Sequence, residues 1–115
     1  MDRPSWVRNE ADWLADCAAI AQCALDLIEG RAAVIETARA MQQLAFKVRD
    51  EQDPNFTVFL AIYSESDALP VGEGRKNWAP SALGREDAKI ESLEQRWRQR
   101  ALQAARVLIN KYGAS

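Results

Sequence analysis

The densest run of apolar residues in the chain, over positions 56–63, has the spacing of one face of an α-helix. Its large side chains fall at i, i+3, i+4 and i+7, which are Phe56, Phe59, Leu60 and Tyr63. Asp53 is suited to cap such a helix, and Pro54 suits its first turn. A buried strand is the alternative, but no other stretch has a strand pattern with which it could pair. We therefore predict a helix here.

Two stretches before this run also have helical periodicity. The first is predicted to begin between Ser5 and Asn9 and to continue to Glu29, with Gly30 as its stop. The second follows from about Ala32 to Asp50. Because the link between them is very short, these two helices should be antiparallel neighbours.

The last helix is predicted to start near Ser81 or shortly after Gly84 and to run to about Tyr112, where Gly113 ends it. The predicted core stripes are, in chain order, Leu14, Cys17, Ala18, Ala21, Leu25 and Ile28; Val34, Ile35, Ala38, Met41, Ala45 and Val48; and Ile90, Leu93, Trp97, Ala101, Ala104, Ala105 and Leu108. Residues 1–115 are thus predicted to form one all-α, antiparallel four-helix domain. Its third helix is the shortest, its fourth is the longest, and a long loop from Ala68 to Pro80 joins them.

The composition is that of a globular protein, with 48% hydrophobic and 28% charged residues. The net charge of −2 argues against general nucleic-acid binding and is compatible with a basic protein partner. No apolar run is long enough to span a bilayer, and the N-terminal residues lack the pattern of a signal peptide. We therefore expect a cytoplasmic protein that does not insert into membranes.

The chain contains no histidine, which removes the usual zinc sites and every nucleophile that depends on a histidine base. Cys17 and Cys23 lie six residues apart on one predicted helix, so they cannot pair with each other and are read as small core residues. The segment from Gly72 to Lys76 lacks the glycine spacing of a phosphate loop, and the carboxylates at positions 50–53 lack that of a calcium loop. We expect no cofactor, no metal and no catalytic residue.

The unusual feature of the third helix is its acidic end. Glu65 and Asp67 sit near the negative pole of the helix dipole, where each typically costs about 0.3–1 kcal/mol. Two interpretations remain open: both carboxylates are simply solvated, with Asp67 starting a turn, or they bind a partner. Leu69 and Trp78 are expected to anchor the long loop that follows. The predicted partner-binding residues are Glu65, Asp67, Leu69, Glu73 and Trp78.

Acidic residues precede basic residues along the last helix, which is the order that the helix dipole favours. The basic residues concerned include Arg96, Arg98, Arg100 and Arg106. Their placement therefore has a structural explanation and does not require nucleic acid. It also complements the acidic first helix, so we predict that these two helices pack side by side.

The segment from Phe59 to Gly72, followed by Trp78-Ala79-Pro80, resembles a family of small bacterial proteins of unknown function. The resemblance extends from about Asp26 to Tyr112, and its core is Ile-x-Ser-Glu-x-Asp-x-Leu-Pro-x-Gly with a downstream Trp. Tyr63 departs from a smaller or polar residue in that pattern. The family implies no activity. In size and composition the chain is similar to immunity proteins, which neutralise toxins delivered between competing bacteria.

These observations favour a non-enzymatic protein-binding module, most concretely an immunity protein that binds a basic toxin domain through the acidic helix end. One alternative is a homodimeric adaptor whose interface would be anchored by Trp6 or Trp13, although a Trp at that spacing is usually part of the core. Another is a hydrolase that uses Glu65 and Asp67, which would require the two carboxylates to face each other in a concave pocket.

Overall fold

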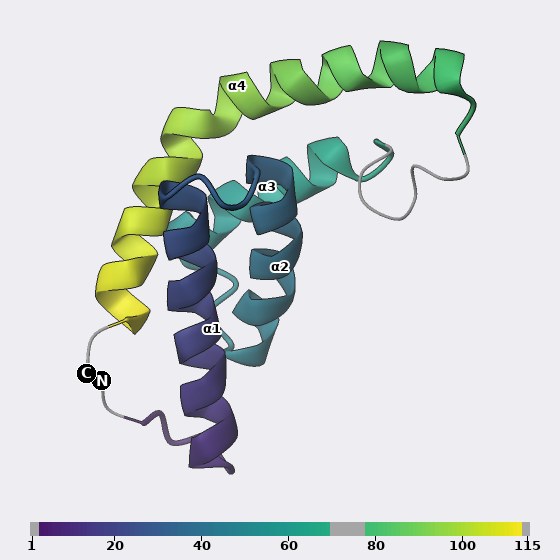
Figure 1. The fold of residues 1–115 in the computed structure, drawn as a ribbon. Helices are drawn as coiled ribbons and strands as arrows, with labels where there is room; N and C mark the ends of the chain where they lie inside the picture. The colour runs from purple at the N-terminus through teal and green to yellow at the C-terminus, as the bar shows by residue number, and fades with distance from the viewer. Residues whose placement is uncertain (1–2, 70–77, 114–115) are drawn as a thin grey trace.

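The computed structural model describes residues 3–69 and 78–113, which form four helices and no strand (Figure 1). They are α1 (Glu10–Ile28), α2 (Val34–Lys47), α3 (Pro54–Ser66) and α4 (Pro80–Tyr112). The predicted all-α class is confirmed, with α3 the shortest helix at 13 residues and α4 the longest at 33. None of these helices is long and apolar enough to cross a membrane.

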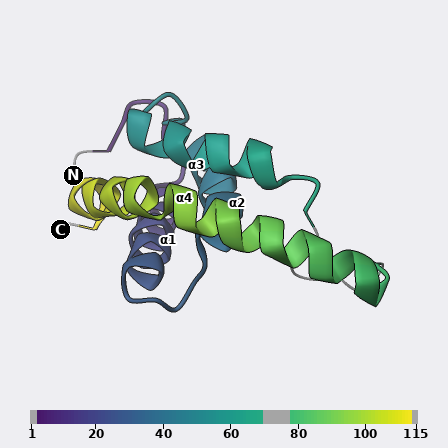
Figure 2. The ribbon, with the colours of Figure 1, turned by 90° about the horizontal axis from the view of Figure 1, so that it is seen from above.

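The helices are arranged as two antiparallel pairs (Figure 1). α2 returns alongside α1, while α4 runs back over α3 and then curves down along α1, as the view from above also shows (Figure 2). Curvature of a long helix around the core is common, because carbonyls on its outer side tilt toward water. The N-terminal half of α4 therefore projects beyond the other helices, whereas its C-terminal half packs on them.

Local signals account for three of the helix boundaries. The Asn9 side chain accepts a hydrogen bond from the backbone N–H of Asp12 at 3.1 Å, and α1 begins at the next residue. Gly30 adopts a φ of 81° just after α1, a conformation that glycine reaches without steric cost. Asp53 accepts a hydrogen bond from the N–H of Asn55 and caps α3, as predicted.

The predicted end of α2 at Asp50 is wrong, because the helix stops at Lys47. Arg49 has a φ of 55°, and it reverses the chain in the left-handed conformation that usually follows a helix. The N–H of Arg49 then donates to Phe46 and that of Asp50 to Ala45, which satisfies the final carbonyls. Glycine is the residue that normally occupies this left-handed position after a helix. Because arginine occupies it here, the sequence gave no signal that α2 ends at Lys47.

The core confirms the predicted stripes on α2 and, for the most part, on α4, but not the stripe on α1. α1 carries two interleaved apolar stripes. The one that is buried consists of Trp13, Cys17, Ile20, Ala24 and Leu27. Of the predicted stripe only Cys17 is buried, while Leu14 is 50% exposed and Leu25 is 37% exposed. Burial favours the stripe with the larger side chains because the free energy gained scales with the apolar area removed from water.

α3 shows a smaller shift of the same kind. Phe56 and Phe59 are buried as predicted, but the third large core residue of this helix is Ile62. Leu60 is 40% exposed. The α3 stripe thus faces the core at i, i+3 and i+6, which leaves the apolar side chain of Leu60 at the surface.

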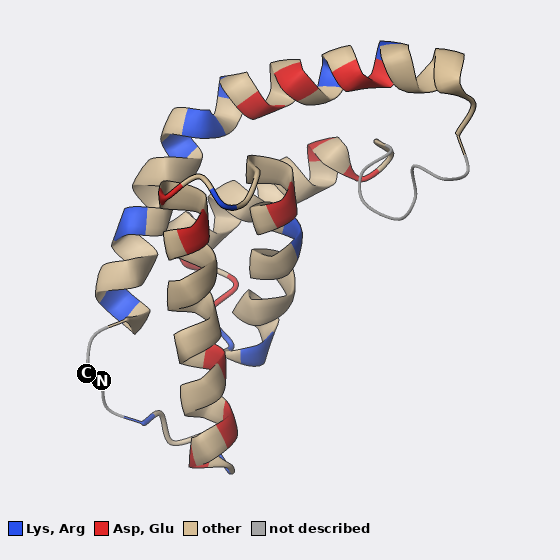
Figure 3. Ribbon diagram, viewed as in Figure 1, with Lys and Arg blue, Asp and Glu red and all other residues tan. Residues whose placement is uncertain are grey.

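The predicted packing of α1 beside α4 is confirmed. Two cations of α4 nevertheless form ion pairs with residues outside α1. Arg96 pairs with Glu65 of α3, and Lys111 pairs with Asp50 and Asp53 in the link before α3. Figure 3 shows basic residues along the C-terminal half of α4, the half that packs on the other helices. Apolar contact therefore holds α1 against α4, where we had invoked complementary charge.

The N-terminus of α2 is capped by a side chain from α4. Ala33, at the cap position, offers no side-chain acceptor. Instead, the two carboxylate oxygens of Glu94 accept hydrogen bonds from the backbone N–H groups of Val34 at 2.7 Å and Ile35 at 2.9 Å. The first four N–H groups of a helix lack partners within it, and a negative charge there also complements the dipole. Glu94 therefore fixes the position of α4 along α2.

This contact predicts that Glu94→Ala lowers the free energy of unfolding by about 1–3 kcal/mol, since two part-buried donors lose a charged acceptor. Glu91→Ala is the matched control, because Glu91 is exposed on the same helix and, within residues 3–69 and 78–113, has a single long contact, to Gln95 at 3.5 Å. That control should change stability by less than about 0.5 kcal/mol. Urea unfolding of both variants checks the difference, and equal losses would contradict the capping role.

Candidate functional site

Glu65, the first residue of the predicted acidic site, is bound by α4. One carboxylate oxygen accepts a hydrogen bond from Arg96 Nη2 at 2.5 Å, and the other accepts one from Trp97 Nε1 at 2.6 Å. The guanidinium of Arg100 lies 4.0 Å from the centre of the Trp97 ring, within the range of a cation–π contact. Glu65 is therefore part of a polar junction between α3 and α4.

The C-terminal turn of α3 receives its compensating cation from α2. Arg39 Nη2 donates to the carbonyl oxygen of Ser66 at 3.1 Å, and the N–H of Leu69 donates to the same carbonyl at 3.0 Å. The Ser66 side chain is fully buried and donates to the carbonyl of Tyr63. A cation near the last carbonyls offsets the dipole that makes acidic residues unfavourable there. The sequence places Arg39 on another helix, so this compensation was missed.

Asp67 differs from Glu65 in its surroundings. It is exposed, it has helical φ and ψ angles just after α3, and it makes no hydrogen bond or ion pair with any residue in the described part of the chain. Of the other predicted site residues, Leu69 packs half-buried against the core and Trp78 is 37% exposed. Glu73 lies outside the described residues, as do Pro70, Arg75 and Lys76.

We call the residues at this junction the α3–α4 surface, which consists of Glu65, Asp67, Arg96, Trp97 and Arg100. It carries charges of both signs and is less acidic than the sequence indicated. Arg96, Trp97 and Arg100 are the members that the sequence did not single out as a site. Their spacing on α4 fits an ordinary amphipathic helix, so no local pattern marked their contact with α3.

This geometry does not favour the hydrolase alternative. Both oxygens of Glu65 already accept hydrogen bonds from α4. Neither Glu65 nor Asp67 is among the residues that line three of the grooves formed by the described residues. A general base needs a free carboxylate oxygen within reach of a bound substrate.

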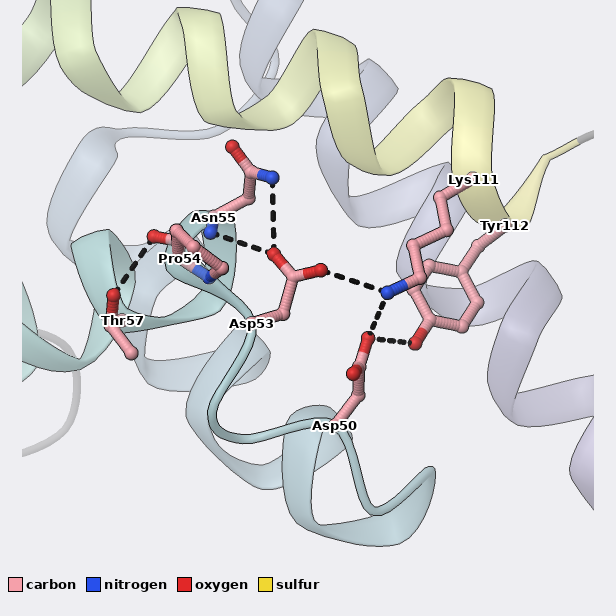
Figure 4. A network of polar contacts seen from close by, with 7 residues as sticks. All are labelled: Asp50, Asp53, Pro54, Asn55, Thr57, Lys111 and Tyr112. Carbon is pink, nitrogen blue, oxygen red and sulfur yellow. Dashed lines mark hydrogen bonds and ion pairs between the residues drawn. The ribbon is translucent and has the colours of Figure 1, made fainter.

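A second polar cluster joins the end of α4 to the segment before α3 (Figure 4). Asp50 accepts hydrogen bonds from Lys111 Nζ at 2.7 Å and from the Tyr112 hydroxyl at 2.5 Å. Asp53 accepts one from Lys111 Nζ at 2.8 Å, while its other oxygen accepts from Asn55. The cation that these two carboxylates bind is thus the ammonium group of Lys111. No group of three metal-ligating side chains occurs among residues 3–69 and 78–113.

The cluster shifts the ionisation of its members. Partial burial alone would raise the pKa of Asp53, but hydrogen bonds from Lys111 and Asn55 outweigh it and hold this pKa below its usual value. Partial burial would likewise lower the pKa of Lys111, yet the bonds to Asp50 and Asp53 raise it. Burial and the hydrogen bond to Asp50 both raise the pKa of Tyr112. The native state thus favours the charged carboxylate, the charged amine and the neutral phenol.

Both cysteines are free thiols. Cys17 is buried in the core, and Cys23 is half-buried at the edge of α1. Burial, with a smaller effect of nearby carboxylates, raises the pKa of Cys23 to about 11. A thiol with a raised pKa is a poor nucleophile at neutral pH, so both residues fit the predicted role of small core side chains.

No protein-family model, curated protein or solved structure matches this chain. The resemblance of the segment from Phe59 to Gly72 to a small bacterial family therefore stays a prediction. The functional argument rests on the α3–α4 surface and on the chemistry of its residues.

The cluster around Lys111 predicts a loss of stability at alkaline pH. The folded-state pKa values of Tyr112 and Lys111 are raised, so their contribution is full below the unfolded values of 10.0 and 10.5 and is lost as pH rises through the folded values. Tyr112→Phe should therefore weaken the decline in urea midpoint as pH rises above about 10. An unchanged decline in that variant would contradict this assignment.

At acid pH the sign is reversed. The lowered pKa of Asp53 stabilises the fold above its unfolded value of 3.8, and this contribution is lost as pH falls through the folded value. Asp53→Asn should flatten the acid limb of the same urea midpoint profile. At alkaline pH this variant should still lose stability through Tyr112. The acid effect of Asp53 can therefore be told apart from the alkaline effect of Tyr112.

Proposed function

We propose that the chain is a non-enzymatic protein-binding module, most concretely a cytoplasmic immunity protein that binds and neutralises a bacterial toxin domain. The observation that carries this proposal is the state of Asp67. Its carboxylate stands exposed at the helix end that a negative charge suits least, and it has no bonding partner in the described part of the chain. A residue that breaks a local rule without a structural gain is a candidate for function.

The residues around Asp67 support a docking role because hydrogen bonds already hold their side chains and backbone in place. Glu65 is bonded to Arg96 and Trp97, and the last carbonyls of α3 accept from Arg39 and Leu69. A surface whose side chains are ordered before binding loses less conformational entropy when a partner docks. The junction thus serves as a rigid base, with Asp67 as the charge that has no partner among the described residues.

A basic partner fits this arrangement. The chain carries a net charge of −2, and opposite charge on a partner speeds encounter and fixes orientation. The arginines of the α3–α4 surface do not argue for nucleic acid, since Arg96 is paired with Glu65 and Arg100 is stacked on Trp97. The exposed ring of Trp78 offers an aromatic anchor of the kind that is common at the centre of interfaces.

The homodimeric adaptor alternative loses one of its two anchors. Trp13 is only 5% exposed and belongs to the core. Trp6 is half-buried, and the guanidinium of Arg49 lies 4.7 Å from the centre of its ring. Trp13 therefore cannot anchor a dimer, whereas Trp6 keeps part of its ring exposed beside Arg49.

The proposal predicts that the product of a gene adjacent to the one for this chain inhibits growth and that co-expression of the chain restores it. Isothermal titration of the two purified proteins should show binding. Asp67→Lys should weaken that binding at least tenfold, or about 1.4 kcal/mol. A neighbouring product that neither inhibits growth nor binds would contradict the immunity proposal.

The structure also determines which variants are informative. Glu65→Lys would place a cation against Arg96 and disturb the α3–α4 junction, so Glu65→Gln is used to test this position. Asp12→Lys is the matched control, since it makes the same charge change at an exposed position near the start of α1. Equal affinities for Asp67→Lys and Asp12→Lys would show that the α3–α4 surface is not the docking site.

A further inference from the structure

A groove between α2 and α3 combines exposed apolar side chains with one unpaired carboxylate. It has a volume of about 230 Å³ and is lined by Gln42, Ala45, Phe46, Glu51, Gln52, Phe56 and Leu60. Phe46 is 56% exposed, the largest fraction among the large apolar residues in the described part of the chain, and Leu60 also lies at the surface. Apolar side chains exposed on both sides of a groove are typical of an interaction site. We call this region the α2–α3 groove.

Glu51 supplies the charge of the α2–α3 groove. Its Oε2 atom is buried, and this oxygen has no hydrogen-bond partner in the described part of the chain. Such burial is unfavourable, because the oxygen loses its contact with water and gains no other donor. The terminal torsion of a glutamate side chain is broad, so the carboxylate can turn this oxygen toward a donor that enters the groove. An incoming donor would therefore gain a hydrogen bond and relieve the unfavourable burial.

The two aspartates in the same link between α2 and α3 do have a partner. Asp50 and Asp53 share the ammonium group of Lys111, at 2.7 and 2.8 Å (Figure 4). Arg49, the basic residue closest to Glu51 in the sequence, lies over a tryptophan ring of the N-terminal segment. The described residues that line the groove include no lysine and no arginine. Glu51 is thus the carboxylate of this link that is left to bind a cation from outside the chain.

The lining of the groove indicates the chemistry of its occupant. The carboxylate favours a cation that donates hydrogen bonds, and the side-chain amides of Gln42 and Gln52 can accept further ones. The exposed ring of Phe46 favours a flat group that can lie against it. The guanidinium of arginine has these properties, because it is planar, carries five N–H donors, stacks on aromatic rings and is more weakly hydrated than an ammonium group.

The size of the groove favours one side chain of a larger partner over a whole small molecule. Sites for drug-sized ligands usually enclose roughly 300–1,000 Å³, which is more than the α2–α3 groove provides. Phe46 and Leu60 also leave apolar surface at its edges for the rest of a partner to cover. Arginine is among the residues that are enriched at the energetic centre of protein interfaces. The net charge of −2 further favours encounter with a basic protein.

We propose that the α2–α3 groove binds an arginine side chain of a basic protein partner. The guanidinium bonds to the carboxylate of Glu51 and stacks against Phe46, while the aliphatic part of the arginine lies along the apolar lining. No member of the α3–α4 surface lines the groove, so this proposal does not rest on the proposed function. It gives a role to the unpaired oxygen of Glu51 and to the exposed ring of Phe46, which the fold does not explain.

An NMR titration of the isotope-labelled chain with N-acetylarginine N-methylamide tests the proposal. This blocked arginine should shift the amide signals of the residues around the groove in a saturable manner. The citrulline analogue has nearly the same shape without the charge and should bind at least tenfold more weakly. The lysine analogue should also bind more weakly than the blocked arginine, because its ammonium group is more strongly hydrated and does not stack on a ring.

Glu51→Gln keeps the shape of the side chain and removes its charge. This variant should bind the blocked arginine at least tenfold more weakly and should no longer prefer it to the citrulline analogue. Its urea midpoint should not fall, because Glu51 Oε2 has no partner to lose. Glu91→Gln on α4 is the matched control and should bind as the wild-type chain does. Phe46→Ala, a change at an exposed side chain, should weaken binding several-fold.

Several results would overturn the proposal. They are shifts that do not saturate, equal binding of the citrulline analogue, tighter binding of the lysine analogue, and a Glu51→Gln variant that keeps its preference for the blocked arginine. Each would leave water as the donor that Glu51 meets. The affinity of Asp67→Lys for the neighbouring gene product tests the α3–α4 surface alone, so either proposal can fail without the other.

Discussion

The fold depends on the rigid spacing of polar side chains along α4. Glu94 binds the first N–H groups of α2, and Tyr112 binds Asp50 just beyond the end of α2. At 1.5 Å of rise per residue, the eighteen residues between Glu94 and Tyr112 span about 27 Å, and the sixteen between Val34 and Asp50 would span about 24 Å. The two lengths agree closely, so α4 can hold the segment from α2 to Asp50 at both ends.

Between these two points α4 also holds α3. Arg96 and Trp97 bind Glu65 near the end of α3, and Lys111 binds Asp53 at its start. Helix termini are the places where backbone groups lack partners and where a charge is most effective. α4 therefore forms hydrogen bonds and ion pairs at the ends of α2 and α3, in addition to the apolar core that it shares with them. One long helix thus orders three shorter ones.

This arrangement leaves one charge of the α3–α4 surface without a bond. The other polar groups there are bonded to one another, whereas Asp67 has no bonding partner in the described part of the chain. This difference is the reason why we propose the α3–α4 surface as the contact for a charged protein partner.

Local signals predicted much of this fold. Asp53 and Pro54 marked the start of α3, Gly30 marked the end of α1, and the large side chains of α2 marked its buried face. Each of these depends on residues close together in the chain. The apolar positions of α1 did not decide its orientation, since two stripes were available and the bulkier one was buried.

The features that the sequence did not reveal all depend on contacts between distant residues. Glu94 is sixty residues from Val34, and Arg96 is thirty-one from Glu65. The acidic site was predicted as a pair, but its two carboxylates lie in different environments. Nothing in the local pattern showed that Glu65 would be bonded to α4 while Asp67 would have no partner among residues 3–69 and 78–113. The end of α2 before Arg49 could not be predicted for a different reason: an arginine rarely adopts the left-handed conformation at a helix end.

Native-state hydrogen exchange tests the central role of α4 most directly. If α4 orders the other helices, the amides from Leu93 to Tyr112 should exchange only through global unfolding, together with the core amides of α1, α2 and α3. The projecting half, from Pro80 to Ile90, should exchange through local opening at a much lower free energy. The account would be contradicted if residues 93–112 exchanged through local opening while the other three helices stayed protected.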